Sequence, residues 1–129
     1  MQREINIWFG NIVLLGVLNE SHTATLIWEA LPLEGDVDLW GEEVYFTIPV
    51  ESKLDAASKD VVEKGDIGYW PTGQAMCIFF GPTPMSQGDE IRPASPVNVV
   101  GEVKGDLRPL KKVTRGSKVR LERYEEQWK

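Results

Sequence analysis

The sequence has one cysteine, one histidine and no long hydrophobic run, and these scarcities exclude several kinds of protein. Cys77 alone cannot form an intrachain disulfide, which favours a reducing, cytoplasmic setting. Together with His22 it cannot supply the ligands of a structural zinc site, so we expect no metal. No apolar run is long enough to span a bilayer, and the N-terminal residues lack the apolar core of a secretion signal. We therefore expect a soluble protein.

Positive charge is also scarce. The net charge is −6 and the isoelectric point is near 4.8, which opposes binding to nucleic acid, because that affinity rests on lysine and arginine. Neither of the glycine-rich phosphate-binding spacings occurs, Gly-x-Gly-x-x-Gly or Gly-x-x-x-x-Gly-Lys-Ser/Thr. The sequence therefore predicts no nucleic-acid partner and no cofactor.

What the sequence does contain is the composition of one ordinary globular domain. Its 129 residues are 42% hydrophobic and 26% charged. A chain of this length buries roughly two thirds of its unfolded surface and needs no disulfide or metal to fold. No repeat, low-complexity tract or linker divides it. We expect a single domain over residues 1–129.

The N-terminal part of the sequence predicts a hairpin followed by a helix. Apolar residues alternate over 5–9, Gly10 and Asn11 are typical of a tight turn, and 12–18 is a second apolar strand. Ser21 is a good N-cap, and apolar residues then recur at helical spacing until Pro32, namely Ala24, Ile27, Trp28 and Leu31. This is the clearest helix in the chain.

The rest of the sequence predicts short strands between glycine and proline turns. Strand character occurs at 43–48, 66–70, 75–80, 97–103 and 118–122. The intervening segments are turn residues at 33–38, a polar stretch at 51–64 that fits a short helix or a loop, an irregular loop at 81–96 and a short helix at 107–113. We expect a mainly β domain, a closed antiparallel barrel capped by one or two short helices. A sandwich fits the periodicity almost as well.

The segment between Gly65 and Gly101 concentrates the aromatic residues. Four of them could wall a ligand pocket or fill the interior of the barrel: Tyr69, Trp70, Phe79 and Phe80. The adjoining turn predicts that Tyr69 and Trp70 are the exposed members. Alternation along the strand predicts that Met76, Ile78 and Phe80 face the interior.

Five other positions carry reactive groups. Arg92 lies in the long loop, where it is either solvated or anchors a ligand. Cys77 is expected to pack in the core and His22 to lie at the surface. The acidic neighbours Glu42 and Glu43 could do acid–base work, but adjacent charges are usually solvated, and we expect that here.

Several motifs together resemble a small prokaryotic family of atypical cyclophilin-like proteins. They are Trp-Gly-Glu-Glu-Val-Tyr-Phe at 40–46, Gly-Asp-Ile-Gly-Tyr-Trp-Pro at 65–71, Phe-Phe-Gly-Pro-Thr-Pro-Met-Ser at 79–86 and Pro-Ala-Ser-Pro-Val-Asn-Val-Val-Gly at 93–101. The resemblance implies a closed barrel of about eight antiparallel strands capped by helices. It implies no established activity, because that of the family is unassigned.

A more distant likeness to true cyclophilins raises the question of prolyl isomerisation. Their catalytic arginine stands in a Phe-His-Arg-Val-Ile-Pro motif, whose counterpart here is Val-Tyr-Phe-Thr-Ile-Pro at 44–49. Either alignment places Phe46 or Ile48 at the arginine, and neither side chain can donate a hydrogen bond. The barrel is therefore expected without the usual catalysis, which leaves enzymatic activity undecided.

We therefore predict a binding module with a groove beside the hairpin turn. It would take a peptide or a small, acidic ligand, and its expected ligand-binding residues are Phe46, Thr47, Tyr69, Trp70, Phe79, Phe80 and Arg92. The alternative is a peptidyl-prolyl isomerase with a non-standard site, in which Arg92 swings in from its loop.

Overall fold

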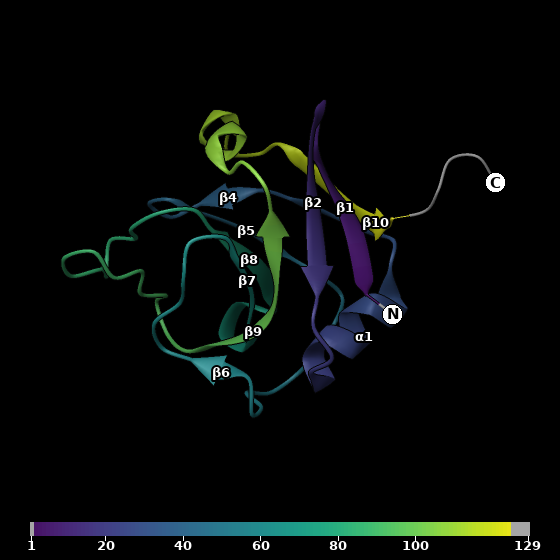
Figure 1. Ribbon diagram of the computed structural model, residues 1–129, viewed down its shortest axis with the longest axis horizontal. Helices are drawn as coiled ribbons and strands as arrows, with labels where there is room; N and C mark the ends of the chain where they lie inside the picture. Colours follow the sequence, from purple (N-terminus) through teal and green to yellow (C-terminus); the bar gives the residue numbers. More distant parts are fainter. Residues whose placement is uncertain (1, 125–129) are drawn as a thin grey trace.

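One curled antiparallel sheet of ten strands dominates the computed structural model, which describes residues 2–124 (Figure 1). Its strand order is β3-β10-β1-β2-β9-β7-β8-β5-β4, with β6 paired to β9 off this path. The strands are β1 (Arg3–Phe9), β2 (Ile12–Leu18), β3 (Leu33–Asp36), β4 (Asp38–Leu39), β5 (Glu43–Thr47), β6 (Ser58–Lys59), β7 (Asp66–Trp70), β8 (Ala75–Phe79), β9 (Val97–Lys104) and β10 (Lys118–Arg123). The predicted mainly β class is confirmed.

The sheet is not closed by hydrogen bonds among the described residues, so the expected closed barrel is not confirmed. Its two edges are β3 and β4, which follow each other in the chain. β3 nevertheless lies close to β5, since a Cβ on Gly35 would be only 3.1 Å from the carbonyl oxygen of Thr47. The two ends of the sheet therefore approach each other across a narrow seam.

The segment 33–38 was expected to be turn residues, and that expectation is wrong. Leu33–Asp36 forms β3, which pairs with β10 in the register Leu33↔Leu121 and Asp36↔Lys118. The paired residues are more than 80 positions apart in the sequence, so the local turn preference of 33–38 cannot predict this pairing. Tertiary pairing overrides the local preference.

The N-terminal hairpin and the helix form as predicted. β1 and β2 pair up to Phe9↔Ile12 across the Gly10–Asn11 turn. Helix α1 (His22–Ala30) begins after Ser21, whose hydroxyl oxygen accepts a hydrogen bond from the Ala24 amide at 3.4 Å. Two short 3-10 helices follow later, η1 (Pro71–Gly73) in the β7–β8 connection and η2 (Arg108–Lys112) near the predicted second helix. None of the helices within residues 2–124 has the length and apolar character needed to cross a membrane.

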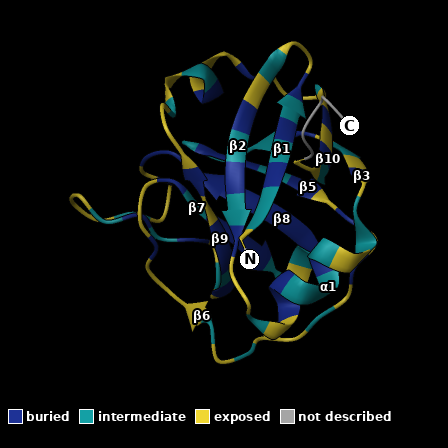
Figure 2. Cartoon of the chain, turned by 45° about the vertical axis from the view of Figure 1, so that its right-hand side comes forward, coloured by how far each residue is buried: buried dark blue, intermediate teal, exposed yellow. Residues whose placement is uncertain are grey.

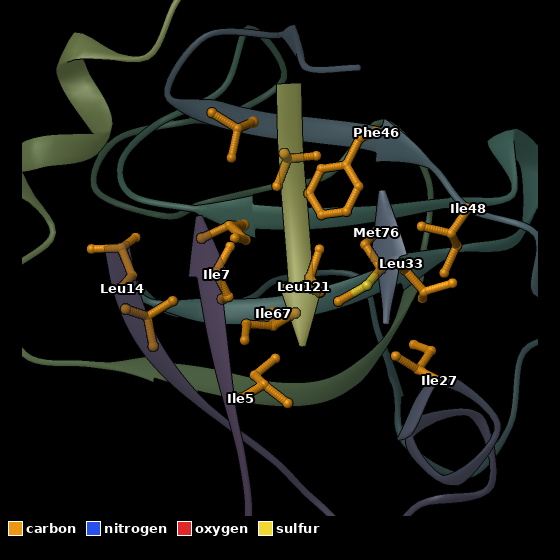
Figure 3. Packing of buried hydrophobic residues seen from close by; sticks show 14 of the residues in the cluster. Ile5, Ile7, Leu14, Ile27, Leu33, Phe46, Ile48, Ile67, Met76 and Leu121 are labelled. Atoms are coloured by element: carbon orange, nitrogen blue, oxygen red, sulfur yellow. The ribbon is translucent and has the colours of Figure 1, made fainter. Parts of the chain in front are cut away.

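The main core fills the inside of the curled sheet, and α1 covers one end of it through Ala24 and Ile27. Figure 3 shows aliphatic side chains from opposite strands, among them Ile7, Ile67 and Leu121, converging with Phe46 in this interior. These side chains are 0–1% exposed. Burial of this apolar surface is the main stabilising contribution to the fold.

β8 is buried on both of its faces (Figure 2). Met76 and Ile78 point into the main core, as predicted, and Phe80 beyond the strand does the same. The alternate residues Cys77 and Phe79 belong to a second, smaller cluster with Val62, Ile91 and Val97. The long irregular loop at 81–96 therefore helps to cover the outer face of the sheet, where this second cluster lies.

A buried asparagine fastens the 50–57 loop to α1 and β9. Asn98 is fully buried, its Oδ1 accepts a hydrogen bond from the Asp55 amide at 2.9 Å, and its Nδ2 donates to Thr23 Oγ1 at 3.0 Å and to the Lys53 carbonyl at 2.9 Å. The polar stretch left open by the sequence is therefore an ordered loop with the two-residue strand β6.

Asn98→Ala should lower the free energy of unfolding by about 2 kcal/mol, because it leaves the Asp55 amide and the Lys53 carbonyl without their partner. Urea denaturation measures this loss. Asn6→Ala, the same change at a partly exposed position on β1, is the control and should stay within about 0.5 kcal/mol of the parent. Equal losses in the two variants would contradict the role given to Asn98.

Candidate functional site

A small apolar pocket lies on the outer face of the sheet, against the second cluster. Its volume is about 170 Å³, and we call it the outer pocket. Strands β5, β7, β8 and β9 and the segment before β9 contribute its walls. Its lining residues are Trp40, Glu43, Tyr45, Trp70, Cys77, Pro93, Ala94 and Val97.

The pairing of β5 with β8 places three of these residues on one face. Glu43 is opposite Phe79 and Tyr45 is opposite Cys77, while the alternate residues of β5, Val44 and Phe46, turn to the core. Successive side chains of a strand point to opposite faces, so Glu43, Tyr45 and Cys77 all face outward. The segment with Pro93 and Ala94 then closes over this face and forms the pocket.

Glu43 is a carboxyl group in an apolar environment. Only 5% of the residue is exposed. Burial raises the pKa of Glu43 from its ordinary value of 4.5 to about 7, and a hydrogen bond with the Cys77 thiol offsets a smaller part of the shift. The outer pocket therefore contains an acid that titrates near neutrality, as a general acid or base requires.

Cys77 is not a reactive thiolate. The residue is 1% exposed, and burial raises the pKa of its thiol, with the negative charge and hydrogen bond of Glu43 adding to the effect. The prediction that Cys77 is packed in the interior is confirmed. The thiol lies beside the Glu43 carboxyl and lowers the pKa of that carboxyl slightly against the larger effect of burial.

Aromatic rings form the walls of the outer pocket. The ring centroids of Tyr45 and Trp70 are 6.3 Å apart, and their planes meet at 83°, so the two rings form adjoining walls. The indole N–H of Trp70 donates to Ser95 Oγ at 2.6 Å, which ties this wall to the segment before β9. Burial raises the pKa of Tyr45, and the charge of Asp38 raises it further, so its hydroxyl stays protonated.

The seven residues predicted to bind a ligand do not come together. Trp70 lines the outer pocket, and Thr47 is exposed at the end of β5. The other aromatic residues are buried, three in the main core and one in the second cluster: Phe46, Tyr69 and Phe80, and Phe79. Ligand contact by these residues stays a prediction, and Trp70 is the one among them that lines the outer pocket.

The expected exposure of Tyr69 is wrong. The residue is 1% exposed, and its hydroxyl donates to the Val50 carbonyl at 2.6 Å. Although the turn Pro71–Gly73 adjoins it, Tyr69 points inward, whereas the next residue, Trp70, points outward. The strand alternation of β7 decides between the two residues, and the turn does not.

Arg92 is engaged with a neighbour on its own loop. Its Nε donates to Glu90 Oε2 at 2.8 Å and its Nη2 to Glu90 Oε1 at 3.3 Å, while 36% of its side chain remains exposed. Its carbonyl accepts a hydrogen bond from the Thr83 hydroxyl. In the structure as described, Arg92 borders Pro93 in the chain but does not line the outer pocket.

Sequence reasoning missed Glu43, which was expected to be solvated beside Glu42. That expectation is wrong for Glu43, which is buried. Glu42 is half-buried and keeps part of its contact with solvent. Period-two alternation does place Glu43 on the same strand face as Tyr45. The burial itself comes from β8 and from residues 93–97, which are distant in the sequence, so local pattern could not reveal it.

The comparisons with known proteins agree with this fold. Residues 3–122 match the family described as Cyclophilin-like. The chain belongs to this cyclophilin-like family. A hypothetical protein from Archaeoglobus fulgidus, solved in solution, is 40% identical to it with a TM-score of 0.81, and the similarity covers 95% of each chain. The resemblance to small prokaryotic cyclophilin-like proteins is confirmed.

A second similar structure is McbB, solved in complex with tryptophan. It is 15% identical to this cyclophilin-like chain with a TM-score of 0.68, and the match covers 95% of this chain but 45% of McbB. At this identity the likeness concerns the fold alone. No curated protein matches the sequence.

Proposed function

We propose that this cyclophilin-like domain binds a small ligand, or one side chain of a peptide, in the outer pocket. Its volume of about 170 Å³ suits one ring-sized group, since a protein cavity of about 150 Å³ accepts benzene. The aromatic walls offer apolar contact, and a pocket of this kind is specific when a few polar groups converge in it.

The observation that carries the proposal is the buried carboxyl of Glu43 facing an aromatic pocket. A buried carboxyl with a raised pKa costs stability whenever it ionises, so a fold under no other demand gains by placing an apolar residue there. Such perturbed groups are common at binding and catalytic sites. Glu43 would thus be the polar group that orients a ligand.

A blocking variant tests the proposal. Ala94 lies exposed at the rim of the outer pocket, so Ala94→Trp should fill the pocket without disturbing the core. Ala56→Trp, at an exposed position in the 50–57 loop, is the matched control. We expect a library of ring-sized fragments and short peptides to shift the NMR signals of Glu43, Cys77, Val97 and the Trp70 indole in the parent and in Ala56→Trp. In Ala94→Trp these shifts should be lost.

Two outcomes would contradict this function. One is binding confined to another surface, such as the open groove between Trp8 and Arg120. The other is binding that Ala94→Trp leaves unchanged.

Prolyl isomerisation is the alternative that the more distant likeness to true cyclophilins suggests. For Arg92 to serve as the donor, it would first have to release Glu90. An NMR exchange assay on Xaa-Pro peptides tests this activity, and Arg92→Ala should abolish it if the arginine takes part. We give this activity second place because Arg92 does not line the outer pocket as described.

A further inference from the structure

We infer that the outer pocket selects an organic ammonium ion carried on a ring-sized apolar body, with the Glu43 carboxylate pairing with its positive charge. This ligand class rests on the proposed function, because it would occupy the same pocket. The charge of the pocket and the arrangement of its aromatic rings both favour a cation.

The charge inside the outer pocket is negative. Within residues 2–124, no lysine or arginine lines the outer pocket, and Glu43 is the acidic residue that does. A buried carboxylate without a cation is unfavourable, and an ammonium group entering the pocket would supply the missing counter-ion. The net charge of −6 also favours the approach of cations. Both effects oppose the acidic ligand that the loop arginine Arg92 suggested.

The aromatic residues around Glu43 suit the same ion. Trp40, Tyr45 and Trp70 line the pocket, and the rings of Tyr45 and Trp70 stand at 83° to each other. The face of an aromatic ring attracts a cation, and groups of aromatic residues bind alkylated ammonium ions in this way. A neutral ligand of equal size would gain only apolar contact from the same walls.

The groups that face Glu43 allow it to ionise when a cation binds. Cys77 from β8 and Tyr45 from β5 both have raised pKa values and stay neutral, and Pro93, Ala94 and Val97 add no titratable group. With a pKa of about 7, Glu43 is half protonated at neutral pH. A bound ammonium would displace this proton, so binding should tighten by about tenfold from pH 6 to pH 8.

Three probes of similar size separate charge from shape. They are phenethylammonium, the neutral 2-phenylethanol and the anionic phenylacetate, each titrated by NMR at pH 8 and, for the cation, also at pH 6. We expect phenethylammonium to bind at least tenfold more tightly than 2-phenylethanol and to shift the signals of the outer pocket. Phenylacetate should not shift them.

A substitution that removes the charge and keeps the shape completes the test. In Glu43→Gln, the preference for phenethylammonium over 2-phenylethanol should fall several-fold, to what the aromatic rings alone provide. The affinity for the alcohol should change less than twofold, and the pH dependence should disappear. Glu42→Gln, which removes the adjacent carboxyl outside the pocket lining, should keep the preference for the cation.

The results distinguish this inference from the proposed function. If the alcohol binds the outer pocket as tightly as the ammonium, or the anion binds more tightly, selectivity for a cation is wrong while ligand binding stands. If none of the three probes shifts the pocket signals, the inference is also wrong, and the wider fragment library decides the proposed function by itself.

Discussion

The Glu43→Gln variant should gain about 3 kcal/mol in free energy of unfolding over the parent when the pH is raised from 4.5 to 8. The parent loses stability over this range because it must ionise a buried carboxyl, and the glutamine variant has no such group. Chemical denaturation of both proteins at a series of pH values measures the difference.

The sign follows from proton binding. Glu43 has an ordinary pKa of 4.5, which applies to the unfolded chain, and burial raises it to about 7 in the folded chain. Between these two values the folded protein holds a proton that the unfolded chain has released. Raising the pH therefore favours unfolding through this window, and the contribution of Glu43 is fully present only below pH 4.5.

A neighbouring carboxyl provides the control for this pH dependence. Glu42 is half-buried and does not line the outer pocket, so Glu42→Gln should not reproduce the gain expected of Glu43→Gln. If the difference in free energy of unfolding between Glu43→Gln and the parent did not change with pH, Glu43 would have its ordinary pKa in the folded protein. The outer pocket would then contain no acid that titrates near neutrality.

Phe46→Ala should lower the free energy of unfolding by about 3 to 5 kcal/mol, because it leaves a cavity in the main core. Phe46 is 1% exposed and lies next to Tyr45 on the same strand, with its side chain on the opposite face. Urea denaturation measures the loss. The milder Phe46→Leu should lose a smaller part and keep the domain folded at room temperature.

Tyr45→Ala is the matched substitution on the other face of β5. It should cost about 1 kcal/mol, since Tyr45 is only partly buried, yet it should weaken ligand binding because it removes a pocket wall. Phe46→Leu should keep the ligand affinity of the parent. The reverse pattern, in which Phe46 affects binding and Tyr45 does not, would restore the sequence-based prediction that Phe46 contacts the ligand.

The parts of the fold that depend on local pattern are predictable from the sequence. Alternation and turn residues are sufficient for the hairpin of β1 and β2, and capping at Ser21 together with helical spacing is sufficient for α1. The strand β3 is different, because its pairing with β10 joins distant residues and is stronger than the turn preference of Gly35 and its neighbours. The type of most helices and strands could be predicted from the sequence. The pairing register of β3 and the seam between β3 and β5 could not.

The candidate site was harder to predict for the same reason. Trp70 was predictable, because an aromatic residue beside a turn is often accessible to a ligand, and Trp70 does line the outer pocket. Glu43 could not, because its burial depends on β8 and on the segment at 93–97. A charged side chain next to another one is normally solvated, and only the tertiary arrangement separates Glu43 from Glu42.

The narrow seam between β3 and β5 has a consequence for how the domain meets other chains. The edge strands of an open sheet expose unpaired backbone groups that can recruit a strand from another molecule. Here β4 is only two residues long and pairs with the first part of β5. The rest of β5, Phe46 and Thr47, lies against Gly35 of β3. Each edge thus shields the other from strand addition, as in a barrel, although no hydrogen-bonded ladder joins them. A side chain at Gly35 would hold the edges apart and open a route to aggregation.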